Sequence, residues 1–88
     1  MKVNEGFVLT SVAGSDLVVA TGKAAKILNG YITLNQTSRI MWDLLEKGCT
    51  EQELVNAILE NYDVDNETAT RDVRAFVEKL NDAGVISL

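Results

Sequence analysis

The sequence contains no histidine, so the side chain that most often acts as a general base near neutral pH is missing. It also has no proline and only one cysteine, Cys49, so no internal disulfide can form. No apolar run approaches the roughly 20 residues of a membrane-spanning helix, and the first residues lack a signal-peptide pattern. Histidine-based catalysis, a disulfide scaffold and a membrane span are therefore not expected, and a lone thiol is typical of a cytoplasmic protein.

Basic residues are also scarce. The chain carries 13 acidic and 8 basic residues, for a net charge of −5. This balance disfavours nucleic acid, because binding to it depends on Lys and Arg neutralising phosphates, and it hinders contact with an anionic membrane. Apolar residues make up 47% of the 88 residues, which suits one modest core. We therefore expect a single domain over residues 1–88 without nucleic-acid or membrane partners.

The first part of the chain has β patterning. Phe7–Val12 and Leu17–Thr21 are rich in β-forming residues, and the turn-forming cluster Ala13–Asp16 separates them. This order predicts a hairpin. Asn29–Gly30 then marks a turn before a third strand at Tyr31–Leu34, where apolar and polar residues alternate.

The connector before that turn is ambiguous. Gly22–Lys26 contains Ala and Lys, which favour a helical turn, but the segment is too short to decide between a turn and a loop. The sequence therefore leaves the conformation between Gly22 and Gly30 open.

Three helices follow, each with a recognisable start. Asn35 can cap a helix over Gln36–Lys47 that carries the only tryptophan, Trp42, which we assign to the core. Thr50 and Glu53 have capping-box spacing for a second helix. Asp65 or Asn66 caps the third and longest helix, and Gly84 ends it. The tail over residues 85–88 is apolar and is expected to fold back on the core. Strands followed by three compact helices predict an α+β, winged-helix-like fold with a three-stranded antiparallel sheet.

Catalytic and metal-binding residues are poorly supplied. Cys49 precedes a helix, but its neighbours are acidic and no histidine can activate it, so we assign it to packing. Carboxylates at Asp63, Asp65 and Glu67 alternate as calcium ligands can, yet the 12-residue loop of such sites is absent and helix capping explains them better. We expect no enzyme activity, no cofactor and no metal site.

An ordered set of motifs runs across nearly the whole chain. The motifs are Leu34-Asn35-x-Thr37-x-x-Ile40-x-Trp42-x-Leu44-Leu45-x-x-Gly48, Thr50-x-x-Glu53-Leu54, Tyr62-Asp63-Val64, Asp72-Val73-x-x-Phe76-Val77-x-x-Leu80 and Gly84-Val85-Ile86. This set resembles the PqqD family, named after pyrroloquinoline quinone synthesis protein D. Each motif alone reflects ordinary helix caps and apolar spacing, but their order in a chain of family length is fairly specific.

The resemblance implies a non-catalytic binding role. Members recognise the leader of a ribosomally made precursor peptide and present it to a modifying enzyme, often a radical S-adenosylmethionine protein. The leader is expected to add as a strand to the third strand and to lie against the third helix. If Ile32 and Leu34 point inward, Tyr31 and Thr33 face outward beside the added strand. The expected peptide-binding residues are therefore Tyr31, Ile32, Thr33, Leu34, Val73, Arg74, Val77 and Asn81.

Two other functions share this topology. A winged-helix DNA-binding regulator is one alternative, although the acidic balance argues against it. An adaptor that docks only on an enzyme surface is another. An open strand edge could also pair with a second copy of the chain, giving a homodimer.

Overall fold

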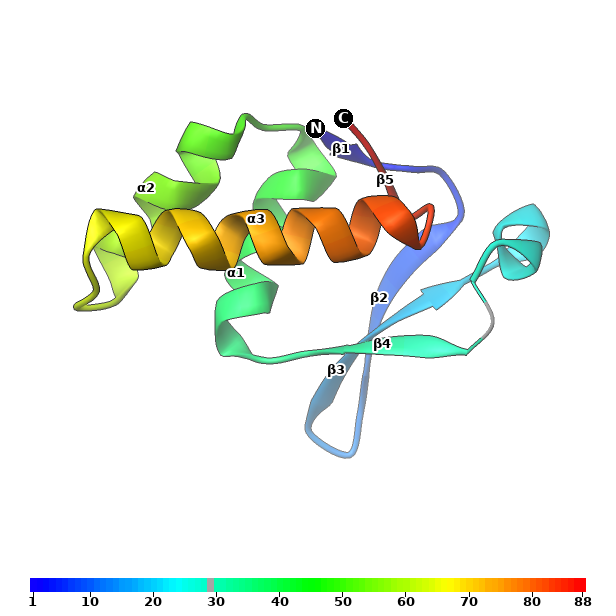
Figure 1. The fold of residues 1–88 in the computed structure, drawn as a ribbon. Coiled ribbons are helices and arrows are strands. Elements are labelled where there is room, and N and C mark those ends of the chain that lie inside the picture. The colour runs from blue at the N-terminus through cyan, green and yellow to red at the C-terminus, as the bar shows by residue number, and fades with distance from the viewer. Residues whose placement is uncertain (29) are drawn as a thin grey trace.

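The structure is a computed structural model and describes residues 1–28 and 30–88. A three-stranded antiparallel sheet comes first and three helices follow (Figure 1), which confirms the predicted α+β architecture. The strand order in the sheet is β2–β3–β4, so β3 is central. The bounds are β2 Phe7–Val12, β3 Ser15–Ala20, β4 Tyr31–Leu34, α1 Gln36–Lys47, α2 Glu51–Asn61 and α3 Asn66–Asp82.

The turn between β2 and β3 is tighter than the sequence suggested. Val12 pairs with Ser15, so only Ala13 and Gly14 form the loop. Both have positive φ, 51° and 82°, as a two-residue type I′ hairpin turn requires. The second strand therefore begins two residues earlier than predicted, and it ends one residue earlier.

The ambiguous connector contains a short 3-10 helix, η1, over Gly22–Lys26. Its start is tied to the sheet by Thr21, whose backbone N–H and Oγ1 both donate to the carbonyl of Gly6, at 2.7 and 3.0 Å. Asn29 of the predicted Asn29–Gly30 turn lies outside the described residues.

The predicted helix caps are confirmed. Asn35 Oδ1 accepts from the backbone N–H of Ser38 at 2.8 Å. Thr50 and Glu53 form the reciprocal capping box. At α3 the cap is Asp65 rather than Asn66, because its Oδ1 accepts from Thr68 at 2.7 Å.

The C-terminal end of α3 closes as a Schellman motif. Gly84 has φ +77° and donates its N–H to Asn81, while Val85 donates to the carbonyl of Leu80 at 2.9 Å. This reversal of the chain directs the tail back over the core, as predicted from its apolar residues.

The two ends of the chain pair with each other, a contact that sequence patterns did not indicate. Strand β1 (Lys2–Val3) pairs antiparallel with β5 (Ile86–Ser87), so the termini lie close together (Figure 1). Asn4 adds hydrogen bonds to the carbonyls of Gly84 and Val85.

One core lies between the helices and the inner face of the sheet. Trp42 has no exposed surface and its Nε1 donates to Glu46, which confirms its assignment to the core. The other apolar residues of α1, which are Ile40, Met41, Leu44 and Leu45, are also buried or half-buried. The side chains with less than 2% exposure are Trp42, Leu45, Leu54, Leu80, Val18, Val73 and Val85.

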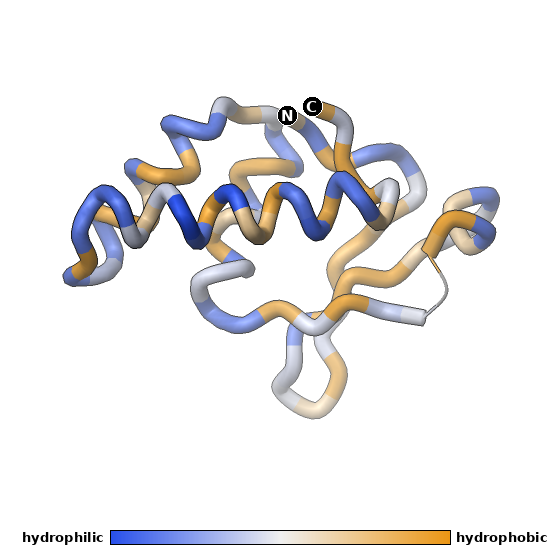
Figure 2. The backbone as a smooth tube through the Cα atoms, in the orientation of Figure 1, coloured by the Kyte–Doolittle hydropathy of each residue, from blue (hydrophilic) through white to orange (hydrophobic). Residues whose placement is uncertain are grey.

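Hydropathy alternates along the helices, and α3 in particular shows hydrophilic and hydrophobic residues in turn (Figure 2). This is the pattern of a helix with one buried face. Among the described residues, no helix is both long enough and apolar enough to span a bilayer.

Candidate functional site

Strand β4 forms one edge of the sheet. On one side it pairs with β3, with Leu17 opposite Thr33 and Val19 opposite Tyr31. On its other side no strand of the described chain is paired with it. Successive residues of a strand direct their backbone groups alternately to the two sides, so two of the four residues direct N–H and C=O groups outward. We call this row of backbone groups the β4 edge.

The side chains of β4 follow the predicted alternation. Ile32 and Leu34 are buried, at 8% and 5% exposure. Tyr31 is 64% exposed and Thr33 is also exposed. The burial of Ile32 and Leu34 on the inner face of the sheet holds the strand in place. The backbone groups of the β4 edge remain available for hydrogen bonding.

Not all of the α3 residues predicted for the site lie near the β4 edge. Val73 has no exposed surface and Val77 is half-buried against the core, so both support the helix from beneath. Arg74 lies on the flank that faces α2, because its Nε is 2.7 Å from Oε1 of Glu51. Asn81, seven residues later, shares that flank.

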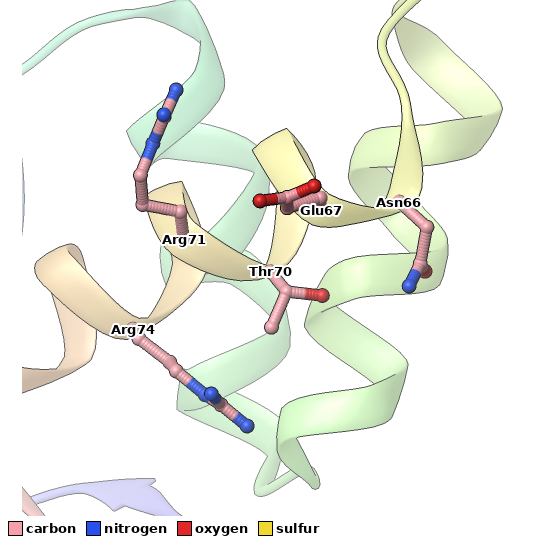
Figure 3. Close-up of a pocket in the computed structure, with 5 residues that line it drawn as sticks. All are labelled: Asn66, Glu67, Thr70, Arg71 and Arg74. Atoms are coloured by element: carbon pink, nitrogen blue, oxygen red, sulfur yellow. The ribbon is translucent and has the colours of Figure 1, made fainter.

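Arg74 also belongs to a separate hollow over the first turns of α3. Figure 3 shows its side chain extending beside Thr70, with Arg71, Glu67 and Asn66 around them. The hollow has a volume of about 540 Å³. It lies on the N-terminal half of α3, and none of its residues belongs to β4.

The opposite flank of α3 faces the end of β4. A hollow of about 220 Å³ lies between this flank and the start of α1. Met41 and Phe76 are its apolar residues, and Asp72 is its only charged one. We call it the α1–α3 hollow, and its lining consists of Asn35, Thr37, Ser38, Met41, Asp72 and Phe76.

A second contact fixes the other end of α3 relative to β4. Ile27, which leads into β4, lies against the turn after α3. A Cβ built on Gly84 would come within 2.6 Å of its Cγ2. Ile27 nevertheless remains 59% exposed. The two contacts place β4 and α3 alongside each other, as Figure 1 shows, with α3 running in the opposite direction.

Cys49, the residue considered for catalysis, lies in an environment typical of a structural residue. Cys49 is buried, and this burial raises the pKa of its thiol, which disfavours a reactive thiolate. Its backbone pairs with that of Met1 through two bonds of 2.9 Å. Within residues 1–28 and 30–88, no cluster of three acidic or cysteine side chains is placed to hold a metal ion.

Residues 7–86 match the family described as Coenzyme PQQ synthesis protein D (PqqD). The chain belongs to the PqqD family. The matched region includes the whole β2–β3–β4 sheet and all three helices, and therefore every residue predicted for peptide binding. No curated protein matches the chain.

Two solved structures share the PqqD fold of this chain. One is described as TbiB1 in complex with the TbiA(beta) leader peptide. It is 26% identical, has a TM-score of 0.80, and the match covers 99% of this chain and 95% of that one. The other is a lasso peptide synthetase B1 complexed with the leader peptide, at 19% identity, TM-score 0.76 and coverage of 96% and 93%. At that identity the second structure shows the shared fold alone.

Sequence reasoning did not assign Asp72 and Phe76 to the site. Both occur in a family motif, Asp72-Val73-x-x-Phe76-Val77-x-x-Leu80, but only Val73 and Val77 of that motif were expected to bind peptide. Both lie beside the β4 end because the chain turns from Leu34 into α1 directly under them. One signal was available: the two are four residues apart, on the flank opposite Arg74 and Asn81.

Proposed function

We propose that the chain is a non-catalytic module that binds the leader segment of a ribosomally made precursor peptide and presents it to a modifying enzyme. The leader adds as a strand to the β4 edge and places a side chain in the α1–α3 hollow. The observation that carries this proposal is an edge strand with an unpaired side, adjacent to a hollow on α3. The similar structure with a bound leader peptide supports the same role.

Backbone pairing alone gives little affinity. Two outward-facing residues of β4 offer up to four hydrogen bonds, worth about 1 kcal/mol each. Association and ordering of a flexible peptide cost at least about 4 kcal/mol, so the two contributions nearly cancel. Side-chain anchors must supply the remainder. Each buried apolar anchor adds about 1.5–3 kcal/mol, so two anchors would give a Kd of roughly several millimolar to tens of micromolar.

The α1–α3 hollow is suited to the first anchor. Its volume of about 220 Å³ is that of a side-chain site rather than a cofactor site. Phe76 is half-buried there and can pack against an incoming apolar group. At the other end, Ile27 and Tyr31 are exposed apolar side chains that can cover a second anchor.

The charges agree with a peptide partner rather than DNA. Helix α3, the helix that would enter a DNA groove in a winged-helix regulator, carries four acidic and three basic side chains. One of the basic side chains, Arg74, is engaged by Glu51. Duplex DNA would meet a chain with a net charge of −5.

The test begins with a search for short peptides encoded beside the gene of this chain, and the leader of each candidate is synthesised and labelled. We expect binding by fluorescence anisotropy and slowed amide exchange at the β4 edge, with unchanged exchange along β2, the other edge strand. Phe76→Ala should weaken binding about tenfold or more, because it removes the apolar wall of the hollow. The matched control is Val12→Ala, which truncates an exposed apolar residue on β2.

Other results would contradict the proposal. Binding of the modifying enzyme without any leader, and no binding of leader alone, would favour the adaptor alternative. Leader binding that protects β2 and leaves β4 unchanged would show that the wrong edge was chosen. A salt-dependent affinity for duplex DNA would favour the regulator.

A further inference from the structure

We call the space between the β4 edge and α3 the groove; the α1–α3 hollow lies at one end of it and the Ile27–Gly84 contact at the other. The flank of α3 on this side carries opposite charges at its two ends. Asp72, Phe76, Lys79 and Ala83 recur at spacings of three and four residues, so they form one stripe along α3. Asp72 lines the hollow beside the end of β4. Lys79 lies two turns further along, toward Gly84 and the Ile27 contact.

Neither charge is neutralised by a close partner. The shortest ion-pair distance of Asp72 is 3.9 Å, to Nε of Arg71, and both side chains are more than half exposed. Such a pair contributes little. Across residues 1–28 and 30–88, Lys79 has no carboxylate within ion-pair distance. Lys26, directly before Ile27, adds a second exposed positive charge at the same end.

We propose that these charges read the order of charged residues in the bound leader: a Lys or Arg beside Asp72, and an Asp or Glu about four residues later beside Lys79. This inference rests on the proposed strand addition. Asp72 and Lys79 are separated by a rise of roughly 10 Å along the helix. On one face of a strand, residues i and i+4 are about 13 Å apart, a difference that long charged side chains can span.

The direction follows from the geometry of β4. The strand runs from the Lys79 end of the groove, at Tyr31, to the Asp72 end, at Leu34. Antiparallel pairing is the more stable arrangement for an added strand. An antiparallel leader therefore begins beside Asp72, so its basic residue precedes its acidic one. Met41 and Phe76 can contact the apolar stem of that Lys or Arg while Asp72 binds its head group.

The experiment is a selection of random twelve-residue peptides displayed against the full chain. We expect enrichment of peptides with Lys or Arg four residues before Asp or Glu. A charge-swapped variant, Asp72→Lys with Lys79→Glu, should enrich the reverse order. The matched control, Glu67→Lys with Arg74→Glu, exchanges an acidic and a basic residue at the same spacing of seven, but on the flank of α3 that faces α2, and should leave the order unchanged.

An enriched peptide is then resynthesised with its two charges exchanged. It should bind the unaltered chain about tenfold more weakly, since two exposed attractions become two repulsions, and the difference should shrink at roughly 1 M salt. The charge-swapped variant should restore its binding. If that variant does not fold, Lys79→Glu alone should remove the preference for the acidic residue.

The outcomes separate the two proposals. Peptides that slow amide exchange along β4 but show no charge order, or the reverse order, would refute the charge readout and leave strand addition standing. If no enriched peptide protects β4, both proposals are wrong.

Discussion

The contact between Ile27 and the turn after α3 can be tested by measuring how a side chain added at Gly84 changes the free energy of unfolding. Gly84 has φ +77°, a conformation that costs an L-residue about 1 kcal/mol. An added Cβ would also lie 2.6 Å from Cγ2 of Ile27, well inside the optimal separation of about 3.5–4.0 Å. Because Ile27 is 59% exposed, its side chain can shift toward solvent, which should cost about 0.5–1.5 kcal/mol more. Gly84→Ala is therefore expected to lower the free energy of unfolding by about 1.5–2.5 kcal/mol.

Two further variants isolate the steric part. Gly14 has a similar φ of +82° but no atom within 4 Å of a built Cβ, so Gly14→Ala should cost only about 1 kcal/mol. In an Ile27→Ala background, Gly84→Ala should cost no more than Gly14→Ala, because the crowded methyl group is gone. The free energies come from urea titrations followed by circular dichroism.

Either of two results would show that Ile27 does not crowd the turn. In the first, Gly84→Ala costs the same as Gly14→Ala. In the second, the extra cost persists in the Ile27→Ala background beyond about 0.5 kcal/mol, the usual limit for independent sites.

Two other predictions concern stability. Ala13→Asn should stabilise the chain by about 0.5–1 kcal/mol in urea titrations, because Ala13 has φ +51° and Asn tolerates this conformation in a type I′ turn; an unchanged or lower stability would contradict it. Hydrogen bonds from the side chain and backbone of Thr68 lower the pKa of Asp65, so its ionised form stabilises the fold above its unfolded pKa and this contribution is lost as the pH falls through the folded pKa. The stability difference between the unaltered chain and Asp65→Asn should therefore be full at pH 7 and shrink below about pH 4, and a difference that grows with acid would show the sign to be wrong.

Local signals in the sequence were sufficient for most of the secondary structure. The helix starts at Asn35 and Thr50 were correct because a cap is a bond between residues three apart, which the sequence displays directly. The inward positions of Ile32 and Leu34 followed from alternation along β4. The pairing of β1 with β5 could not be predicted, since strands of two residues carry no periodicity.

The site was harder to predict, for a geometric reason. Apolar spacing in α3 identifies its buried face through Val73, but it does not tell which flank meets β4 and which meets α2. Arg74 was therefore predicted for the groove, whereas the structure places it beside Glu51. Asp72 and Phe76 lie on the flank toward β4 because of how α1 follows that strand, which is a tertiary relationship.

The pairing of β1 with β5 has a consequence for protein engineering. Because the first and last residues lie side by side, a short linker could join them, and new ends could be opened at the exposed hairpin tip, Ala13–Gly14, without crossing the core. For the same reason the whole unit could be spliced into a surface loop of a host enzyme, where two neighbouring attachment points would hold it with its recognition strand still accessible.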